Sequence, residues 1–129
     1  MKQKIEKFVL SIFKGFDQLE PEDKFLPYIS EEAIIRFPNE PDYIGKKGFL
    51  DWYRGAQAAF FAPTIHTVLN MEVEELEDQQ GLFKVTFDLY FKATLTSDGA
   101  TLENTPKEIW IIDFSNSDNP LIKEYNVLV

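Results

Sequence analysis

The sequence contains no cysteine and only one histidine, His66, among its 129 residues. Without cysteine, the chain has no disulfide, no thiol nucleophile and no thiolate ligand for a metal. A single histidine with scattered carboxylates argues against a transition-metal site. The sequence also lacks a glycine-rich phosphate loop and a serine in a nucleophile-elbow context. We therefore expect neither a metal nor a cofactor.

Basic residues are few. Lysine and arginine number 13 against 22 aspartates and glutamates, which gives a net charge of −9 and a pI near 4.5. Such a surface repels phosphate backbones and anionic membranes, so we expect no nucleic-acid or membrane partner. No stretch approaches the roughly 18 apolar residues of a membrane span, and no secretory signal is evident. These features favour a soluble, cytoplasmic protein.

Apolar residues are plentiful, at 44% of the chain, and twelve residues are phenylalanine. A chain of this length with this composition can bury a real core. Because neither an internal repeat nor a linker interrupts it, we expect one domain over residues 1–129.

The first half of the chain reads mainly as helix. Helices are predicted at 2–19, 22–29 and 45–60, with a short strand at 33–37 between the last two. In the first helix, apolar residues recur at the spacing of one helical face: Ile5, Phe8, Val9, Ile12, Phe13 and Phe16.

The second half reads as strands. They are predicted at 66–76, 82–95, 107–114 and 121–129, with turns at 77–81 and 97–99. In the longest strand, odd-numbered residues from Phe83 to Leu95 are apolar. Helices followed by long antiparallel strands define an α+β class, in which the helices cover one face of a curved sheet. The resulting cone has an open mouth suited to a ligand.

Four segments carry a resemblance to a known family: "AIIRFP", "YIGKKGFLDWY", "KEIWIID" and "PLIKEYNVLV". Their order resembles the nuclear transport factor 2-like superfamily, in particular its SnoaL-like branch. The resemblance implies a cystatin-like cone with a mainly antiparallel sheet. It also implies a homodimer formed through the open sheet face.

Two shorter segments resemble the scytalone dehydratase and hexachlorocyclohexane dehydrochlorinase families. They are "GFDQLEPEDKF", with Asp17, and "TIHTVLN", with His66. In those families an aspartate orients a histidine that removes a proton during elimination. The resemblance therefore implies a catalytic pair of His66 and Asp17. Neutral imidazole is a suitable base near pH 7.

Strand periodicity argues against this pair. His66 falls in phase with Asn70 and Glu72, not with the apolar Leu69 and Met71, which favours a partly exposed histidine at a strand edge. A bulge, or a loop start after Pro63, would reverse the phase. Asp17, on the flank of the first helix, can likewise reach either a pocket or solvent.

Several other side chains are candidates for the pocket. Substrate-binding wall residues are predicted at Tyr28, Trp52, Tyr53, Trp110 and Tyr125, although core packing is the default interpretation of such aromatic residues. Arg36 could bind an anionic substrate group or pair with surface acids. Polyketide cyclases of the superfamily use an acid on the sheet, and the resemblance makes Glu108 or Asp113 a candidate for that role. Such an acid needs a pKa raised by burial, whereas a solvent-facing strand carboxylate is the simpler interpretation.

Two functional hypotheses follow. The first is a cofactor-independent lyase, isomerase or cyclase that acts on a small apolar organic molecule. The second is a non-enzymatic ligand-binding or dimerisation module with the same fold. A separation of about 3 Å between His66 and Asp17 at a cavity would favour the first hypothesis, and more than about 6 Å the second.

Overall fold

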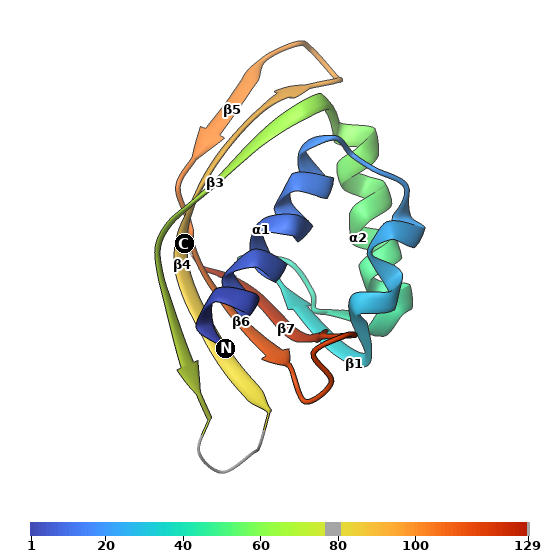
Figure 1. Ribbon diagram of the computed structural model, residues 1–129. Coiled ribbons are helices and arrows are strands. Elements are labelled where there is room, and N and C mark those ends of the chain that lie inside the picture. Colours follow the sequence, from blue (N-terminus) through green and yellow to red (C-terminus); the bar gives the residue numbers. More distant parts are fainter. Residues whose placement is uncertain (77–80, 129) are drawn as a thin grey trace.

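The computed structural model describes residues 1–76 and 81–128. Its helical elements lie inside the curve of a single sheet (Figure 1). They are α1 (Lys2–Asp17), the 3-10 turns η1 (Glu22–Lys24) and η2 (Leu26–Tyr28), and α2 (Gly45–Ala59). The strands are β1 (Ile29–Arg36), β2 (Tyr43–Ile44), β3 (Phe60–Glu75), β4 (Leu82–Leu95), β5 (Thr101–Asn104), β6 (Lys107–Asp113) and β7 (Leu121–Leu128).

The sheet has the order β2-β1-β7-β6-β4-β3, and β5 pairs with the far part of β4. Strands β1 and β7 run parallel, and the other pairs are antiparallel. The long strands β3 and β4 curl around the helices (Figure 1). This is the α+β cone with a mainly antiparallel sheet that the sequence predicts.

Helix α1 fills the hollow of the sheet. All six residues of its predicted apolar stripe are buried. The Phe13 ring contacts Phe87 of β4 and Trp110 of β6, with ring centroids 5.8 and 5.2 Å apart. None of the helices within the described residues has the length and apolar character needed to cross a membrane.

Several predicted boundaries move. The predicted helix at 22–29 is instead two 3-10 turns. Pro27 lies in the first turn of the second one, where its missing N–H costs nothing, whereas inside a longer helix it would remove a hydrogen bond. Strand β3 starts directly after α2, earlier than the predicted residue 66. The short strands β2 and β5 have no clear periodic signal. Of the turn predicted at 77–81, residues 77–80 lie outside the described residues.

Strand β4 confirms the predicted alternation. Its inward residues Phe83, Val85, Phe87, Leu89 and Ala93 are buried, and the first four of them belong to the hydrophobic core. Their polar neighbours face the opposite side of the sheet, because successive side chains of a strand alternate. The inner face of the sheet therefore carries the core, and the same face continues toward the cavity described below.

Strand β3 departs from simple alternation at Asn70. The pairing of β3 with β4 shifts between Leu69 and Glu72, and Asn70 has a φ of 57°. Asparagine tolerates this left-handed conformation better than most residues. Before the bulge, Val68 packs toward the core, and after it Met71 does. The prediction that His66 faces away from Met71 is therefore wrong, because one residue is inserted between them.

Candidate active site

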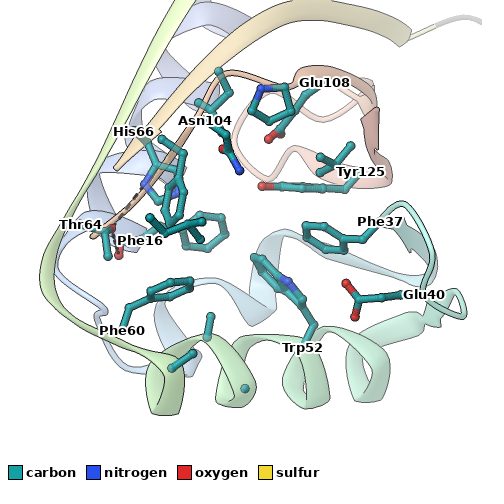
Figure 2. A pocket seen from close by; sticks show the side chains of 18 of the residues that line it. Phe16, Phe37, Glu40, Trp52, Phe60, Thr64, His66, Asn104, Glu108 and Tyr125 are labelled. Atoms are coloured by element: carbon teal, nitrogen blue, oxygen red, sulfur yellow. Dashed lines mark hydrogen bonds between the residues drawn. The ribbon is translucent and has the colours of Figure 1, made fainter. Parts of the chain in front are cut away.

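A cavity of about 850 Å³ lies between α2, the inner face of the sheet and the segment that joins β1 to β2. Aromatic rings form much of its wall, and polar groups occupy separate places on it (Figure 2). The principal aromatic lining residues are Phe16, Phe37, Trp52, Tyr53, Phe60, Phe91 and Tyr125. The polar lining residues include Glu40, Thr64, His66, Asn104 and Glu108. The cavity thus combines an apolar wall with a few groups that can do acid–base chemistry.

His66 and Asp17 meet at one side of this cavity. Asp17 is the last residue of α1, and His66 lies near the start of β3. The Nδ1 atom of His66 is 2.6 Å from Oδ1 of Asp17, and their side chains are 12% and 26% exposed. The Thr64 hydroxyl lies 3.3 Å from the same carboxylate oxygen and donates to it. The carboxylate is therefore held between two donors.

Aromatic rings fix the plane of the imidazole. Phe13 stacks on it with centroids 5.0 Å apart and planes 21° apart, and Phe91 contacts it at 4.9 Å. His66 lines the cavity, whereas Asp17 is not among the lining residues. The carboxylate therefore stands behind the imidazole and acts on a ligand only through it.

This geometry sets the tautomer of His66. A carboxylate only accepts hydrogen bonds, so Nδ1 carries the proton that it donates to Asp17. In the neutral ring the lone pair is then on Nε2. No described residue hydrogen-bonds to Nε2 of His66. If Nε2 were fully buried it would count as a buried nitrogen without a partner, and the described part of the chain has no such atom. Nε2 is therefore accessible, as a base must be.

Glu108 is the second acid–base group of the cavity. On β6 it shares the inward phase of Trp110 and Ile112, and it is 2% exposed. The Trp110 indole Nε1 donates to its Oε1 over 3.0 Å. Burial raises the pKa of Glu108 to about 8, although hydrogen bonds from Trp110 and Tyr125 partly oppose this rise. At neutral pH the carboxyl group is mostly protonated.

Asp113, the alternative acid candidate, has a different environment. It ends β6 in the opposite phase and accepts hydrogen bonds from the backbone N–H and the hydroxyl of Ser115. Its partial burial alone would raise its pKa, but these bonds and the charge of Lys123 outweigh that effect and lower it. Of the two candidates, only Glu108 lines the cavity.

Three of the predicted wall residues line the cavity: Trp52, Tyr53 and Tyr125. The Tyr53 hydroxyl donates to the backbone oxygen of Glu20 over 2.5 Å, and burial raises the pKa of Tyr53 to about 12. Its ring rather than its hydroxyl is thus available to a ligand. Trp52 stacks on Phe37 with centroids 5.5 Å apart and gives the cavity a flat aromatic surface.

The other three predicted binding residues do not line the cavity. Tyr28 packs edge-on against Phe8, and Trp110 is fully buried behind Glu108. Arg36 lies on the outer face of the sheet because its neighbour Ile35 occupies the inward phase of β1. It donates to Glu124 over 3.1 Å and to Asn126 over 2.9 Å, and it pairs with Asp42 over 3.5 Å. Tyr28, Trp110 and Arg36 are therefore not in a position to contact a ligand in this cavity.

Sequence reasoning missed several lining residues. The alternation of β4 already placed Phe91 on the inner face, so its role could have been found. Phe37, directly after β1, and Phe60, at the start of β3, stand at element boundaries, where periodicity is weakest. Asn104 and Glu40 lie in a short strand and a connecting segment, so only the folded chain brings them to the cavity.

The described residues offer no obvious place for a metal. No group of three or more histidine, cysteine, aspartate or glutamate side chains among them gathers closely enough to hold an ion. The groups of the cavity that can move or hold a proton are His66 with Asp17, and Glu108 with Tyr125.

Helices enclosed by a curled sheet of this topology form the nuclear transport factor 2-like fold, and comparison with solved structures confirms it. No protein-family model matches the sequence, and no curated protein is significantly similar to it. A nuclear transport factor 2-like superfamily protein from Salmonella enterica serovar Typhimurium is 18% identical, with a TM-score of 0.82 over 98% of this chain and 88% of that one.

Two further solved structures share the fold. Hexachlorocyclohexane dehydrochlorinase (LinA) type 2 is 14% identical, with a TM-score of 0.81 over 98% of this chain and 82% of that one. A Novosphingobium aromaticivorans protein, named provisionally as a scytalone dehydratase, is 10% identical, with a TM-score of 0.85 over 98% and 81%. At these identities the likeness establishes a common fold and no more.

Proposed function

We propose that this protein is a cofactor-independent lyase or isomerase that acts on a small, largely apolar organic molecule. His66 is its general base, and Asp17 is the positioning residue behind it. The observation that carries the proposal is the 2.6 Å contact between His66 Nδ1 and Asp17 at the wall of an aromatic cavity. A lone surface histidine would need neither the partly buried carboxylate of Asp17 nor the stacked ring of Phe13.

The proposed reaction begins when Nε2 of His66 takes a proton from a carbon atom of the substrate. The electron pair of that C–H bond then either expels a leaving group, which is elimination, or forms an enolate that takes up a proton at another carbon atom, which is isomerisation. Asp17 stabilises the imidazolium that forms. A well-placed base of this kind contributes about 10²–10⁴-fold in rate.

Glu108 supplies the complementary acid in this proposal. With a pKa of about 8 it carries a proton at pH 7 and can give it to a leaving group or to an enolate oxygen. A base and a separate protonated acid facing one cavity are a recurring arrangement in such enzymes. The names of two structural neighbours, a dehydrochlorinase and a provisional dehydratase, describe eliminations and support the lyase alternative.

The test compares His66→Ala and Asp17→Asn with the wild type on a panel of eliminable and enolisable substrates. We expect kcat/KM to fall by about 10²–10⁴-fold for His66→Ala and by a smaller factor for Asp17→Asn. Thr67→Ala is the matched control, because Thr67 follows His66 on β3 but its side chain is exposed. Undiminished turnover in both variants would contradict the proposal.

The non-enzymatic alternative keeps the same cavity. Its support is the wall itself, since stacked rings such as Phe37 and Trp52 bind an apolar ligand whether or not it reacts. Stoichiometric binding without turnover of any binding ligand would favour a carrier. Dimerisation through the outer sheet face stays a prediction, which sedimentation of the purified protein would test.

A further inference from the structure

The cavity offers no lysine or arginine to a ligand. Among the described lining residues the carboxyl groups are those of Glu40 and Glu108, and Glu108 is mostly protonated at neutral pH because burial raises its pKa to about 8. The chain has 13 lysine and arginine residues, and two of the arginines form ion pairs away from the cavity. Arg36 pairs with Glu124 on the outer face of the sheet, and Arg54 pairs with Glu22. The one basic lining side chain, His66, already has its counter-ion in Asp17.

An anionic ligand would be poorly accommodated in such a cavity. It would lose its hydration shell against aromatic rings and gain no unpaired cation in return, which is unfavourable. Glu40, near the flat pair of Phe37 and Trp52 (Figure 2), would repel it further. Arg36, which the sequence offered as a partner for an anionic group, does not line the cavity, and its guanidinium pairs with Glu124.

A neutral oxygen, in contrast, has partners. The carboxyl group of Glu108 and the hydroxyl of Tyr125 lie on one side of the cavity, and His66 lies on the other (Figure 2). Trp110 uses its only donor on Glu108 Oε1 and thereby fixes the carboxyl group. A protonated carboxyl group both donates and accepts hydrogen bonds, so it can bind either a carbonyl or a hydroxyl.

We propose that the cavity selects an uncharged, flat substrate whose carbonyl or hydroxyl oxygen binds to the carboxyl group of Glu108, beside Tyr125, and that it rejects carboxylates of the same size. This proposal rests on the proposed function in one respect, namely that the ligand binds in this cavity. It does not require turnover, so the same selectivity is expected if the protein is a carrier.

Binding of matched two-ring probes tests the proposal without any need for turnover. The probes are 2-naphthol, 2-acetonaphthone, naphthalene and 2-naphthoate, measured at pH 7 by calorimetry. We expect the two oxygenated neutral probes to bind best and 2-naphthoate to bind at least about tenfold more weakly than 2-naphthol. Equal or tighter binding of 2-naphthoate would overturn the proposal.

Variants separate the two parts of the selectivity. Glu40→Lys changes an exposed residue, so the fold should persist, and we expect the affinity for 2-naphthoate relative to that for 2-naphthol to rise severalfold. Glu108→Leu should abolish the preference for 2-naphthol over naphthalene, whereas Glu108→Gln, which still donates and accepts, should retain part of it. A preference that survives Glu108→Leu in a folded protein would contradict the role of Glu108.

The two proposals fail in distinguishable ways. Full turnover in His66→Ala with intact selectivity against 2-naphthoate would remove the catalytic role of His66 and leave the substrate class standing. Loss of turnover in His66→Ala, together with tight binding of 2-naphthoate by the wild type, would support the catalytic role of His66 and overturn the proposed substrate class.

Discussion

Two carboxylates on the same strand show how strongly the two faces of the sheet differ. Glu108 points to the inner face, and burial raises its pKa to about 8. Asp113 ends the same strand on the other phase, and although its partial burial works in the opposite direction, hydrogen bonds from Ser115 and the charge of Lys123 lower its pKa. The protonation state of a strand carboxylate therefore depends on which face it occupies and not on its residue type.

The same contrast holds for basic groups. On the inner face, His66 lies among phenylalanine rings with one carboxylate partner. On the outer face, Arg36 is surrounded by Asp42, Glu124 and Asn126 and is partly exposed. Inner groups are few and have defined partners, which suits chemistry, whereas outer groups form redundant networks, which suit solubility.

The largest expected effect concerns Glu108 and pH. Because the folded pKa of about 8 exceeds the ordinary value of 4.5, the unfolded chain loses this proton first as pH rises. Stability conferred by protonated Glu108 is then complete below about pH 4.5 and declines up to about pH 8. We expect the free energy of unfolding of the wild type to fall by up to about 4 kcal/mol relative to Glu108→Gln between pH 5 and pH 8, measured with urea.

Asp113→Asn is the matched control on the same strand. The folded pKa of Asp113 is lowered, so its contribution is present above its unfolded pKa and is lost as pH falls through the folded value. Between pH 5 and pH 8 the free energies of unfolding of Asp113→Asn and of the wild type should therefore change by the same amount. If the free energy of unfolding of Glu108→Gln also follows that of the wild type over this range, Glu108 is not a buried neutral acid.

A smaller effect is expected at the bulge of β3, which decides the face that His66 occupies. Asn70 has a φ of 57°, which a β-branched side chain disfavours. We expect Asn70→Val to lower the free energy of unfolding by about 1–2 kcal/mol, and Asn70→Gly to change it little. Equal stability of the two variants in urea would show that this backbone conformation is not required.

The smallest effect is expected at Arg36. Because its guanidinium pairs on the outer face, Arg36→Gln should leave the affinity for 2-naphthol within about twofold of the wild type. Calorimetric titration measures this affinity directly. A loss of tenfold or more would place Arg36 in contact with the ligand and would weaken the contrast between the faces.

Much of the fold follows from the periodic segments. The apolar stripe of α1 and the alternation of β4 each identified buried residues, such as Phe13 and Phe87, because those elements are long and regular. The short strands β2 and β5 pair only because the folded chain brings them to a sheet edge. Such elements carry too few residues for a periodic signal.

The site was less accessible to sequence reasoning, for a physical reason. The phase of His66 could not be read from β3 because the insertion at Asn70 reverses it, and no residue pattern announces such a bulge. Glu108, in contrast, shares its phase with the buried Trp110 and could have been separated from Asp113 by parity alone. The separation between His66 and Asp17 is a long-range distance that only the fold defines.

The central claim is that Asp17 holds the imidazole with its proton on Nδ1, leaving Nε2 free as a base. Nitrogen-15 NMR of tag-free protein tests it directly, because His66 is the only histidine and gives one pair of ring signals. The account predicts that neutral His66 is protonated on Nδ1, coupled to a carboxylate, and that Asp17→Asn weakens this preference. A neutral ring protonated on Nε2, unaffected by Asp17→Asn, would contradict it.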